Sequence, residues 1–202
     1  MSSSAGNELR EETAACCGTI LRMLMDAAEF LHSWPECWIS ARAAALPVVN
    51  VHVTQISAPP ERVWQALESE TLIAPRAGWR ALLALREAIG KMAGWDKGLQ
   101  VHAHQPLAPE NFYSFFRIEH VAAPAQARGG LLELGLSVEN KLTRAFVSFV
   151  VERAGHSSHL FNVTAAEFFG ITGRMYWRVI RPFHDGITEA MLDEARRRAE
   201  RR

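Results

Sequence analysis

The chain has 202 residues, of which 49% are hydrophobic and 22% are charged, and its 22 Lys and Arg residues balance its 22 Asp and Glu residues. Length and composition are typical of a single globular domain with a sizeable core. A neutral chain without a basic block in its body argues against a nucleic-acid partner, and we expect none. No apolar run reaches the roughly 18 residues of a membrane helix, so we expect no membrane insertion.

Residues 1–47 are interpreted as an N-terminal extension with a helix predicted over Thr13–Phe30, where apolar residues show partial helical spacing. The first residues lack the basic start and apolar centre of a signal peptide, so the expected location is the cytoplasm. The cysteines are Cys16, Cys17 and Cys37. Their spacing fits neither a disulfide framework nor a zinc site, so buried thiols are the expected role.

Val48–Ile56 alternates in character and is rich in β-branched residues, which predicts a strand. Its two faces carry Val49, Val51, Val53 and Gln55 on one side and Val48, Asn50, His52, Thr54 and Ile56 on the other. Pro60 suits the first turn of a helix, and Glu61–Ser69 has the apolar positions of one. A second helix is predicted over Ala77–Met92.

Beyond residue 98 the hydrophobic period changes to two, and turn-forming stretches separate the segments. The predicted strands are Leu99–Gln105, Phe112–His120, Leu131–Val138, Leu142–Glu152 and His159–Phe169. A strand, two short helices and a run of strands before a final helix is an α+β order, in which the strands form one antiparallel sheet.

Gly170–Arg202 is predicted to be one long amphipathic helix that covers this sheet. An apolar residue recurs every four positions, as Ile171, Met175, Val179, Phe183, Ile187 and Met191. We expect Met175, Val179, Phe183 and Ile187 to be buried against the sheet. Thr172 is the expected N-cap. Pro182 removes a backbone hydrogen bond and should either kink the helix near Val179–Arg181 or divide it in two.

This order of elements resembles the helix-grip fold of the Bet v 1, START and polyketide-cyclase superfamily, in which an antiparallel sheet curls around a long C-terminal helix. In detail the chain is similar to the bacterial DUF2867 family. The residues that carry the resemblance are Ser57–Trp64, Trp79–Arg86, Gly173–Tyr176 and Pro182–His184. It covers roughly residues 48–197 and implies a single helix-grip domain over 48–202, with a cavity between sheet and helix.

Two departures from the family pattern are visible. Phe169 and Gly170 stand where relatives usually have His-Asn, and Lys141–Thr143 stands where a His-Leu-Asp strand motif is usual. A site that used those polar groups in relatives is altered or absent here. No Gly-rich loop follows a strand, so no dinucleotide is implied. We expect no cofactor.

Several residues could serve a site. His102 and His104 are two apart on a predicted strand, but two histidines on a solvated strand face are commoner than a metal pair, so no metal is expected. Arg117 and Glu119 share a strand face, and depending on register they either face solvent or form a buried pair that holds the head of a polar ligand.

Glu167 lies among apolar residues of the last strand. If it pointed inward its pKa would rise and it could act as an acid or base, whereas an outward orientation makes it a surface residue. Arg174, Tyr176 and His184 lie on the last helix, where Tyr176 and His184 are about two turns apart and face similar directions. They are candidates to line the cavity. In the alternative interpretation, Arg174 simply pairs with a carboxylate of the sheet and Tyr176 is a core residue.

The leading hypothesis is a protein that binds a small hydrophobic molecule between the sheet and the last helix, because 10 Phe and 6 Trp supply apolar lining with few polar anchors. The alternatives are a cyclase- or hydrolase-like enzyme that uses acid and base residues in the same cavity, and a protein-interaction domain with a filled core. Fold resemblance alone does not decide among them.

Overall fold

The computed structural model describes residues 22–69, 101–125 and 130–201, together with residues 81, 84, 87, 88, 90, 91 and 94. The predicted helix over Ala77–Met92 falls mostly outside the described residues, as does the first part of the helix predicted over Thr13–Phe30. Within the range Thr13–Phe30, residues Arg22–Met25 form strand β1 rather than a helix, because they pair with the strand Val48–Ile56.

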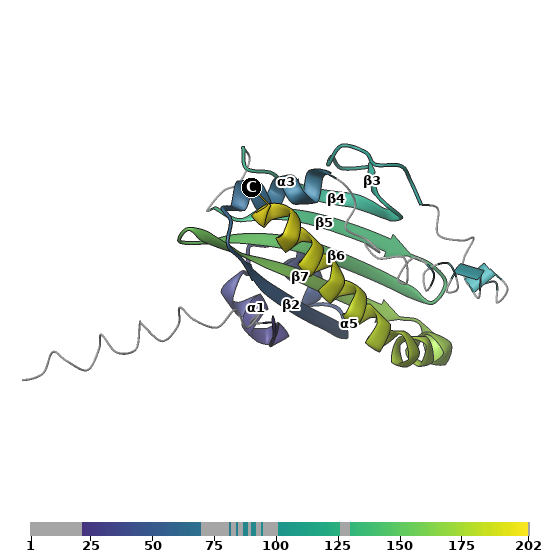
Figure 1. The fold of residues 1–202 in the computed structure, drawn as a ribbon. Coiled ribbons are helices and arrows are strands. Elements are labelled where there is room, and N and C mark those ends of the chain that lie inside the picture. Colours follow the sequence, from purple (N-terminus) through teal and green to yellow (C-terminus); the bar gives the residue numbers. More distant parts are fainter. Residues whose placement is uncertain are drawn as a thin grey trace, which may run out of the picture.

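The described residues form a seven-stranded antiparallel sheet in the order β1-β2-β7-β6-β5-β4-β3 (Figure 1). The central strands are β2 (Val48–Ile56), β7 (Ser157–Phe168), β6 (Thr143–Ala154) and β5 (Leu132–Glu139). At the far edge lie β4 (Phe116–Ala122) and the two-residue β3 (Phe112–Tyr113). The helices are α1 (Ala27–Ser33), α2 (Trp38–Ala43), α3 (Pro60–Ser69) and α5 (Gly170–Glu200).

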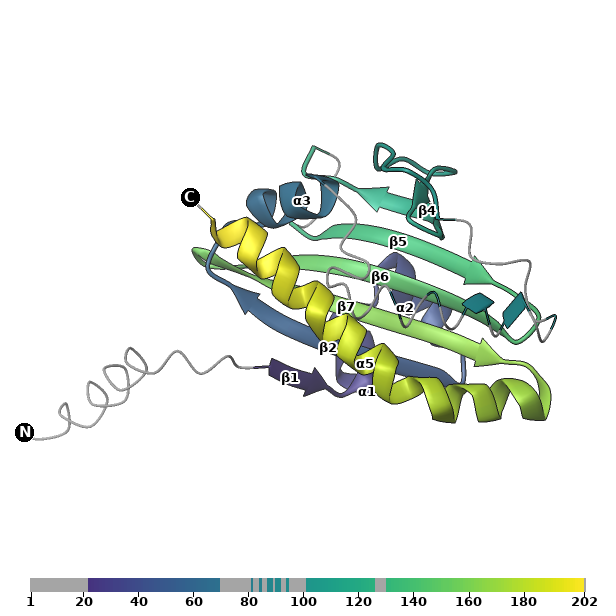
Figure 2. The same cartoon turned by 45° about the vertical axis from the view of Figure 1, so that its right-hand side comes forward.

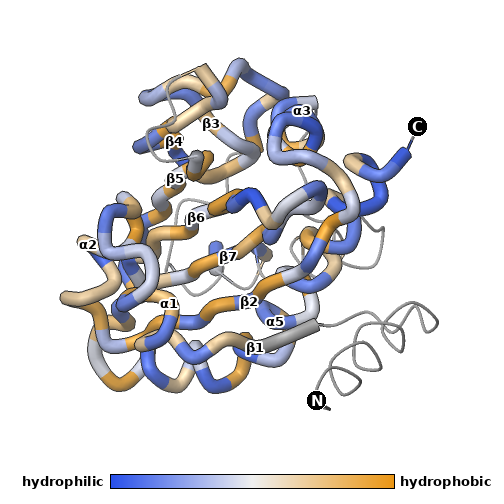
Figure 3. Tube along the Cα trace, turned by 90° about the vertical axis from the view of Figure 1, so that its left-hand side faces the viewer, coloured by the Kyte–Doolittle hydropathy of each residue, from blue (hydrophilic) through white to orange (hydrophobic). Residues whose placement is uncertain are grey.

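Helices cover both faces of the sheet. Figure 3 shows α1 and α2 on one side and α3 and α5 on the other, with hydrophobic segments concentrated in the strands between them. Two cores result. Ile39 of α2 and Val51 of β2 belong to the core under α1 and α2, while Leu67 of α3, Leu134 of β5 and Ala195 of α5 belong to the core on the opposite face. The predicted α+β helix-grip architecture, an antiparallel sheet with a long C-terminal helix packed on it, is confirmed.

Two predicted strands differ in the structure. The range Phe112–His120 is divided into β3 and β4 by a tight turn, in which Ser114 has a positive φ of 63° and Tyr113 pairs with Phe116. The described part of Leu99–Gln105 is not a strand. Residue His102 donates one backbone hydrogen bond to Ser114 and its ring stacks on Phe112, so the segment lies beside the hairpin without joining the ladder.

Helix α5 starts where the chain leaves β7 through Gly170, whose φ of 63° is in the left-handed region that glycine tolerates. Its N-cap is Phe169, which makes no side-chain capping bond, so the expected cap at Thr172 is wrong by one turn. A Cβ at Gly173 would lie 2.6 Å from the carbonyl oxygen of Leu142, so only glycine lets the first turn approach the sheet this closely.

Pro182 lies inside a helix that continues through it. Figure 2 shows the axis of α5 bending part-way along its length, as expected from a missing hydrogen bond at proline. No helix among the described residues is both long enough and apolar enough to span a membrane.

The expected burial of the first half of α5 is wrong. Met175, Val179 and Phe183 are 61%, 68% and 47% exposed, and only Ile187 packs against the core. The reason is geometric. A stripe that repeats every four residues rotates by about 40° per step around a helix of 3.6 residues per turn, so its members cannot all face the same sheet.

Candidate functional site

The face of the sheet under α5 carries polar side chains where β2 lies next to β7. Asn50 is directly opposite Thr164, and His52 is directly opposite Asn162. Strand alternation places all four side chains on the face that α5 covers. From the helix, His184 and Asp185 reach down to them. These six residues, Asn50, His52, Asn162, Thr164, His184 and Asp185, are called the polar cluster below.

Asn50 links the strand to the helix. Its Nδ2 donates to Oδ1 of Asp185 at 2.8 Å and lies 3.0 Å from Nε2 of His52. Since an amide nitrogen can only donate, Nε2 of His52 accepts the second hydrogen. His52 is therefore the neutral tautomer with its proton on Nδ1.

The environment of His52 favours this neutral form. The side chain is almost fully buried, and burial lowers its pKa below the ordinary value of 6.5, although nearby Asp185 acts in the opposite direction. The separation of 3.5 Å between Nε2 of His52 and Oδ1 of Asp185 is thus a contact between a neutral imidazole and a carboxylate. At neutral pH it is not an ion pair.

Asp185 is the charged member of the cluster. A hydrogen bond with His184 lowers the pKa of the Asp185 carboxyl, and partial burial opposes this effect. Nδ1 of His184 lies 3.5 Å from Oδ1 of Asp185, while its Nε2 lies 3.4 Å from the hydroxyl of Thr164. The His184 ring therefore connects the helix carboxylate to β7.

Asn162 is the unusual member of the cluster. It is 1% exposed, and neither Oδ1 nor Nδ2 of its side chain has a hydrogen-bond partner within the described structure. Leaving a buried polar group unpaired is unfavourable by about 1–3 kcal/mol. This face of the sheet therefore holds an unused amide NH2 group and an unused amide oxygen at Asn162, opposite His52.

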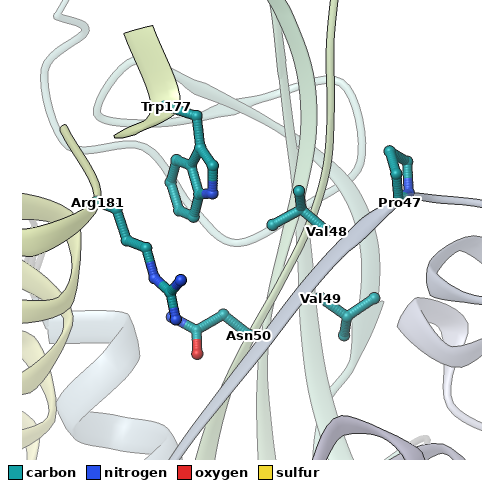
Figure 4. A pocket seen from close by; sticks show the side chains of 6 residues that line it. All are labelled: Pro47, Val48, Val49, Asn50, Trp177 and Arg181. Carbon is teal, nitrogen blue, oxygen red and sulfur yellow. The ribbon is translucent and has the colours of Figure 1, made fainter. Parts of the chain in front are cut away.

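A pocket of about 240 Å³ opens beside the cluster, between the start of β2 and the first half of α5. Figure 4 shows Trp177 and Arg181 of α5 facing Val48 and Asn50 of β2. Pro47 and Val49 complete the lining. The pocket lies at the edge of β2 that β1 leaves uncovered, because β1 pairs only with residues 51–54.

The pocket has an apolar wall and a polar wall. The indole of Trp177 stacks on Phe168 with ring centroids 4.9 Å apart, and its plane meets that of His184 edge-on. Arg181 supplies the positive charge. Its side chain is 64% exposed, and Nε lies 3.9 Å from Oδ2 of Asp185.

The structure does not bring the six predicted site residues together. Arg117 and Glu119 lie on β4, separated from β2 by three strands, where Arg117 pairs with Glu110 and Glu119 accepts a hydrogen bond from Ser137. Glu167 is a partly exposed residue that pairs with Arg144 at 3.2 Å. On α5, Arg174 is exposed and Tyr176 is half-buried, and only His184 joins the polar cluster.

The remaining members were missed by the sequence reasoning. A signal was present for two of them, because Asn50 and His52 share a strand face with Ile56, which is fully buried. Polar residues on the buried face of a strand need partners, and such positions indicate a site. The helix residues Trp177, Arg181 and Asp185 lie outside the four-residue apolar stripe. That stripe predicts the wrong face of α5 as the one that packs on the sheet.

Within the described ranges no three His, Cys, Asp or Glu side chains are grouped closely enough to hold a metal ion. His102 and His104 do not share a strand, because residues 101–105 are irregular. The imidazoles of the polar cluster are engaged with Asn50, Thr164 and Asp185 instead.

Comparisons with known proteins agree with the family resemblance. The profile of the family described as "Protein of unknown function (DUF2867)" matches residues 43–191. No curated protein gives a significant match.

Among solved structures, the chain is similar to the hypothetical protein jhp0584 from Helicobacter pylori, with 14% identity over 83% of this chain and 95% of that one and a TM-score of 0.46. It is also similar to norcoclaurine synthase from Thalictrum flavum, with 12% identity over 74% and 84% and a TM-score of 0.42. The MLL2253 protein from Mesorhizobium loti gives 15% identity over 74% and 98%, with a TM-score of 0.40. Similarities this low support no conclusion about activity.

Proposed function

The chain belongs to the DUF2867 family, and we propose that it binds a small molecule with an apolar ring and one anionic end in the pocket between β2 and α5. The observation that carries this proposal is the pairing of a tryptophan wall with an exposed guanidinium across a pocket of about 240 Å³. Ligand sites combine apolar lining with a few placed polar groups in the same way.

The size of the pocket limits the ligand. Its volume is below the roughly 300–1,000 Å³ of pockets that hold drug-sized molecules. A single or fused aromatic ring is the group best suited to it, because it can lie against Trp177 and the side chain of Val48.

The charge around the pocket specifies the polar end. Among the described residues, Arg181 contacts one carboxylate, that of Asp185, at 3.9 Å, and that carboxylate already accepts a hydrogen bond from Asn50. Most of the guanidinium therefore remains available, and its planar donors match a carboxylate. This refines the hydrophobic ligand expected from the sequence to an aromatic carboxylate or a similar anion.

A matched pair of probes tests the proposal. Indole-3-acetate and its neutral amide, indole-3-acetamide, differ only in the charge of the polar end. We expect calorimetric titration to show saturable binding of both, with the carboxylate bound about three- to tenfold more tightly. Arg181→Gln should remove that preference, and Trp177→Ala should weaken both. Arg144→Gln, which removes an exposed arginine on β6, is the control. Equal binding by wild type and Trp177→Ala would contradict the site, and no saturable binding of either probe would contradict the proposed ligand class.

A second candidate is a cyclase- or hydrolase-like enzyme that uses the polar cluster. The observation in its favour is a neutral, buried His52 next to the Asp185 carboxylate, with the unpaired amide of Asn162 beside it. A neutral imidazole is a competent general base near neutral pH. Chemical change of a bound probe, detected by mass spectrometry and lost in His52→Gln, would select this candidate over simple binding.

A further inference from the structure

The first half of α5 exposes a row of large apolar side chains. Ile171, Met175, Val179 and Phe183 are 71%, 61%, 68% and 47% exposed. Each is one helical step of four residues from the next, so they form a continuous, slowly rotating ridge about 18 Å long at 1.5 Å per residue. This set is called the apolar ridge below. Neighbouring exposed apolar side chains of this kind mark interaction surfaces more often than isolated ones.

The charges beside the apolar ridge have a single sign. Between Gly170 and His184 the helix contains Arg174, Arg178 and Arg181 and no acidic residue. At 100° per residue these arginines fall along one border of the ridge. Arg174 and Arg178 are exposed and make no ion pair or hydrogen bond within the described structure. The segment is therefore a helix with an apolar face and a basic border.

We propose that this half of α5 docks peripherally on an anionic lipid bilayer. The ridge would lie among the headgroups and the upper acyl chains, while Arg174 and Arg178 contact lipid phosphates. An exposed helix that combines a bulky apolar face with arginines has the features of interfacial membrane-binding helices. Attraction of basic residues to an anionic leaflet adds to the burial of the apolar face.

The shape of the surface favours a bilayer over a protein partner. A groove on a partner protein receives apolar residues that lie on one face of a helix, at positions i, i+3, i+4 and i+7. The apolar ridge instead repeats every four residues and turns by about 120° between Ile171 and Phe183, so its members do not face one groove together. A second copy of the chain would place two arginine-lined ridges against each other, which like charges oppose. A fluid bilayer accepts a convex apolar ridge without a shaped partner.

This docking differs from membrane insertion. No described helix could span a bilayer, and the second half of α5 is held on the protein core by Met191, Leu192 and Ala195. Only the exposed face of the first half is available, so binding should be reversible and sensitive to salt.

The test is co-sedimentation of the full chain with vesicles of phosphatidylcholine alone and with vesicles that contain phosphatidylglycerol in equal proportion. Val179→Asp places a charge on the ridge. Val101→Asp is a matched control, because Val101 is 69% exposed and Val179 is 68% exposed. We expect binding to the mixed vesicles that falls about tenfold in Val179→Asp and is unchanged in Val101→Asp. Arg174→Gln with Arg178→Gln should lower binding to mixed vesicles and reduce its salt dependence, whereas Arg197→Gln near the end of the helix should not.

Three outcomes would overturn the proposal. One is the absence of binding to phosphatidylglycerol vesicles. Another is equal binding by Val179→Asp and wild type. The third is a large drop in melting temperature for Val179→Asp but not for Val101→Asp, because it would show that the ridge is covered within the protein. If the wild type self-associates without binding vesicles, and Val179→Asp abolishes that association, the apolar ridge binds a second copy of the chain.

Discussion

Nδ2 of Asn50 donates to Oδ1 of Asp185 at 2.8 Å, and this bond joins β2 to α5 across 135 positions of the sequence. It lies three residues beyond Pro182, where the helix passes from its exposed half to its packed half. The bond holds α5 against the edge of β2 and so defines one side of the pocket between them. Ligand binding in that pocket should therefore depend on Asp185, although Asp185 does not line it.

Asp185→Ala should destabilise the protein by about 1–2 kcal/mol, because it removes a charged acceptor that Asn50 uses, while partial exposure to water limits the loss. Urea unfolding measures this change. Glu61→Gln, which disrupts a half-exposed surface ion pair with Arg153, should cost less than about 1 kcal/mol. An equal loss of stability in the two variants would show that the hydrogen bond between Asn50 and Asp185 stabilises the fold no more than a surface ion pair does.

Acidification should destabilise the protein through His52. Burial lowers the pKa of His52 in the folded state below its ordinary value of 6.5, so the unfolded chain binds the proton more readily. The contribution to stability is complete above pH 6.5 and is lost as the pH falls below it. Urea unfolding at pH 7.5 and pH 5.5 should show a smaller loss in His52→Gln than in wild type, since the other seven histidines are common to both. An identical loss would contradict a lowered pKa.

Asp185 acts in the same direction at more acidic pH. Its folded-state pKa is lowered from 3.8 by the bond with His184, so its contribution is present above 3.8 and is lost as the pH falls through the folded value. The carboxyl of Asp185 titrates at lower pH than the His52 imidazole. Asp185→Asn removes a charge that favours protonated His52, so it should leave the loss between pH 7.5 and 5.5 intact or enlarge it, and it should reduce the loss below pH 4.

The two halves of α5 should respond differently to the same substitution. Met191 is 8% exposed and belongs to the core under α5, whereas Met175 is 61% exposed. Met191→Ala should cost about 2–5 kcal/mol through lost burial and a cavity, and Met175→Ala should change stability by about 0.5 kcal/mol or less. Differential scanning calorimetry of both variants checks the contrast. A similarly large loss of stability in both variants would show that Met175 is buried.

Helix α2 should depend on one buried carboxylate. Glu133 of β5 accepts hydrogen bonds from the backbone nitrogens of Trp38 and Ile39 at 2.8 and 3.1 Å and from the hydroxyl of Ser148 at 2.7 Å. Glu133→Ala should cost about 3 kcal/mol or more, because two backbone amides at the start of α2 lose their side-chain acceptor and the buried hydroxyl of Ser148 keeps only the carbonyl oxygen of Leu134. Glu139→Ala, at the exposed end of the same strand, should be nearly neutral in the same unfolding assay. A neutral Glu133→Ala would refute this anchoring role.

Alternation along the sequence was sufficient to predict much of the sheet. Strand β2 has the predicted bounds, Val48–Ile56, because its turn-forming neighbours end it on one side and its β-branched residues alternate cleanly. Strand β1 could not be predicted, since its four residues are strand only through pairing with β2. The sequence pattern predicts the length of α5 correctly, but it predicts the wrong face of its first half to be buried. The sheet contacts Gly173, Trp177 and His184, which follow the period of the helix, while the four-residue stripe rotates away.

The site was less accessible to sequence reasoning because it is formed by pairing across the sheet. Nothing in the sequence places Asn162 opposite His52 until the register of β2 and β7 is known, and nothing places Asp185 beside His52 until α5 is packed on the sheet. His184 was selected for its position on the helix, and the structure places it in the polar cluster through Thr164. Its predicted role in the cavity stays a prediction, as do those of Arg117, Glu119, Glu167, Arg174 and Tyr176.

The measurement that most directly tests ligand binding is native mass spectrometry of the chain purified from the cells in which it naturally occurs. The double variant Trp177→Ala with Arg181→Gln is expressed in the same cells and purified in parallel. We predict one small molecule of defined mass bound to the wild-type chain, absent from the variant and recoverable by denaturing extraction. The same adduct on both proteins would contradict the pocket between β2 and α5 as the binding site. A wild-type chain that carries no molecule and binds neither indole probe would contradict the proposed function.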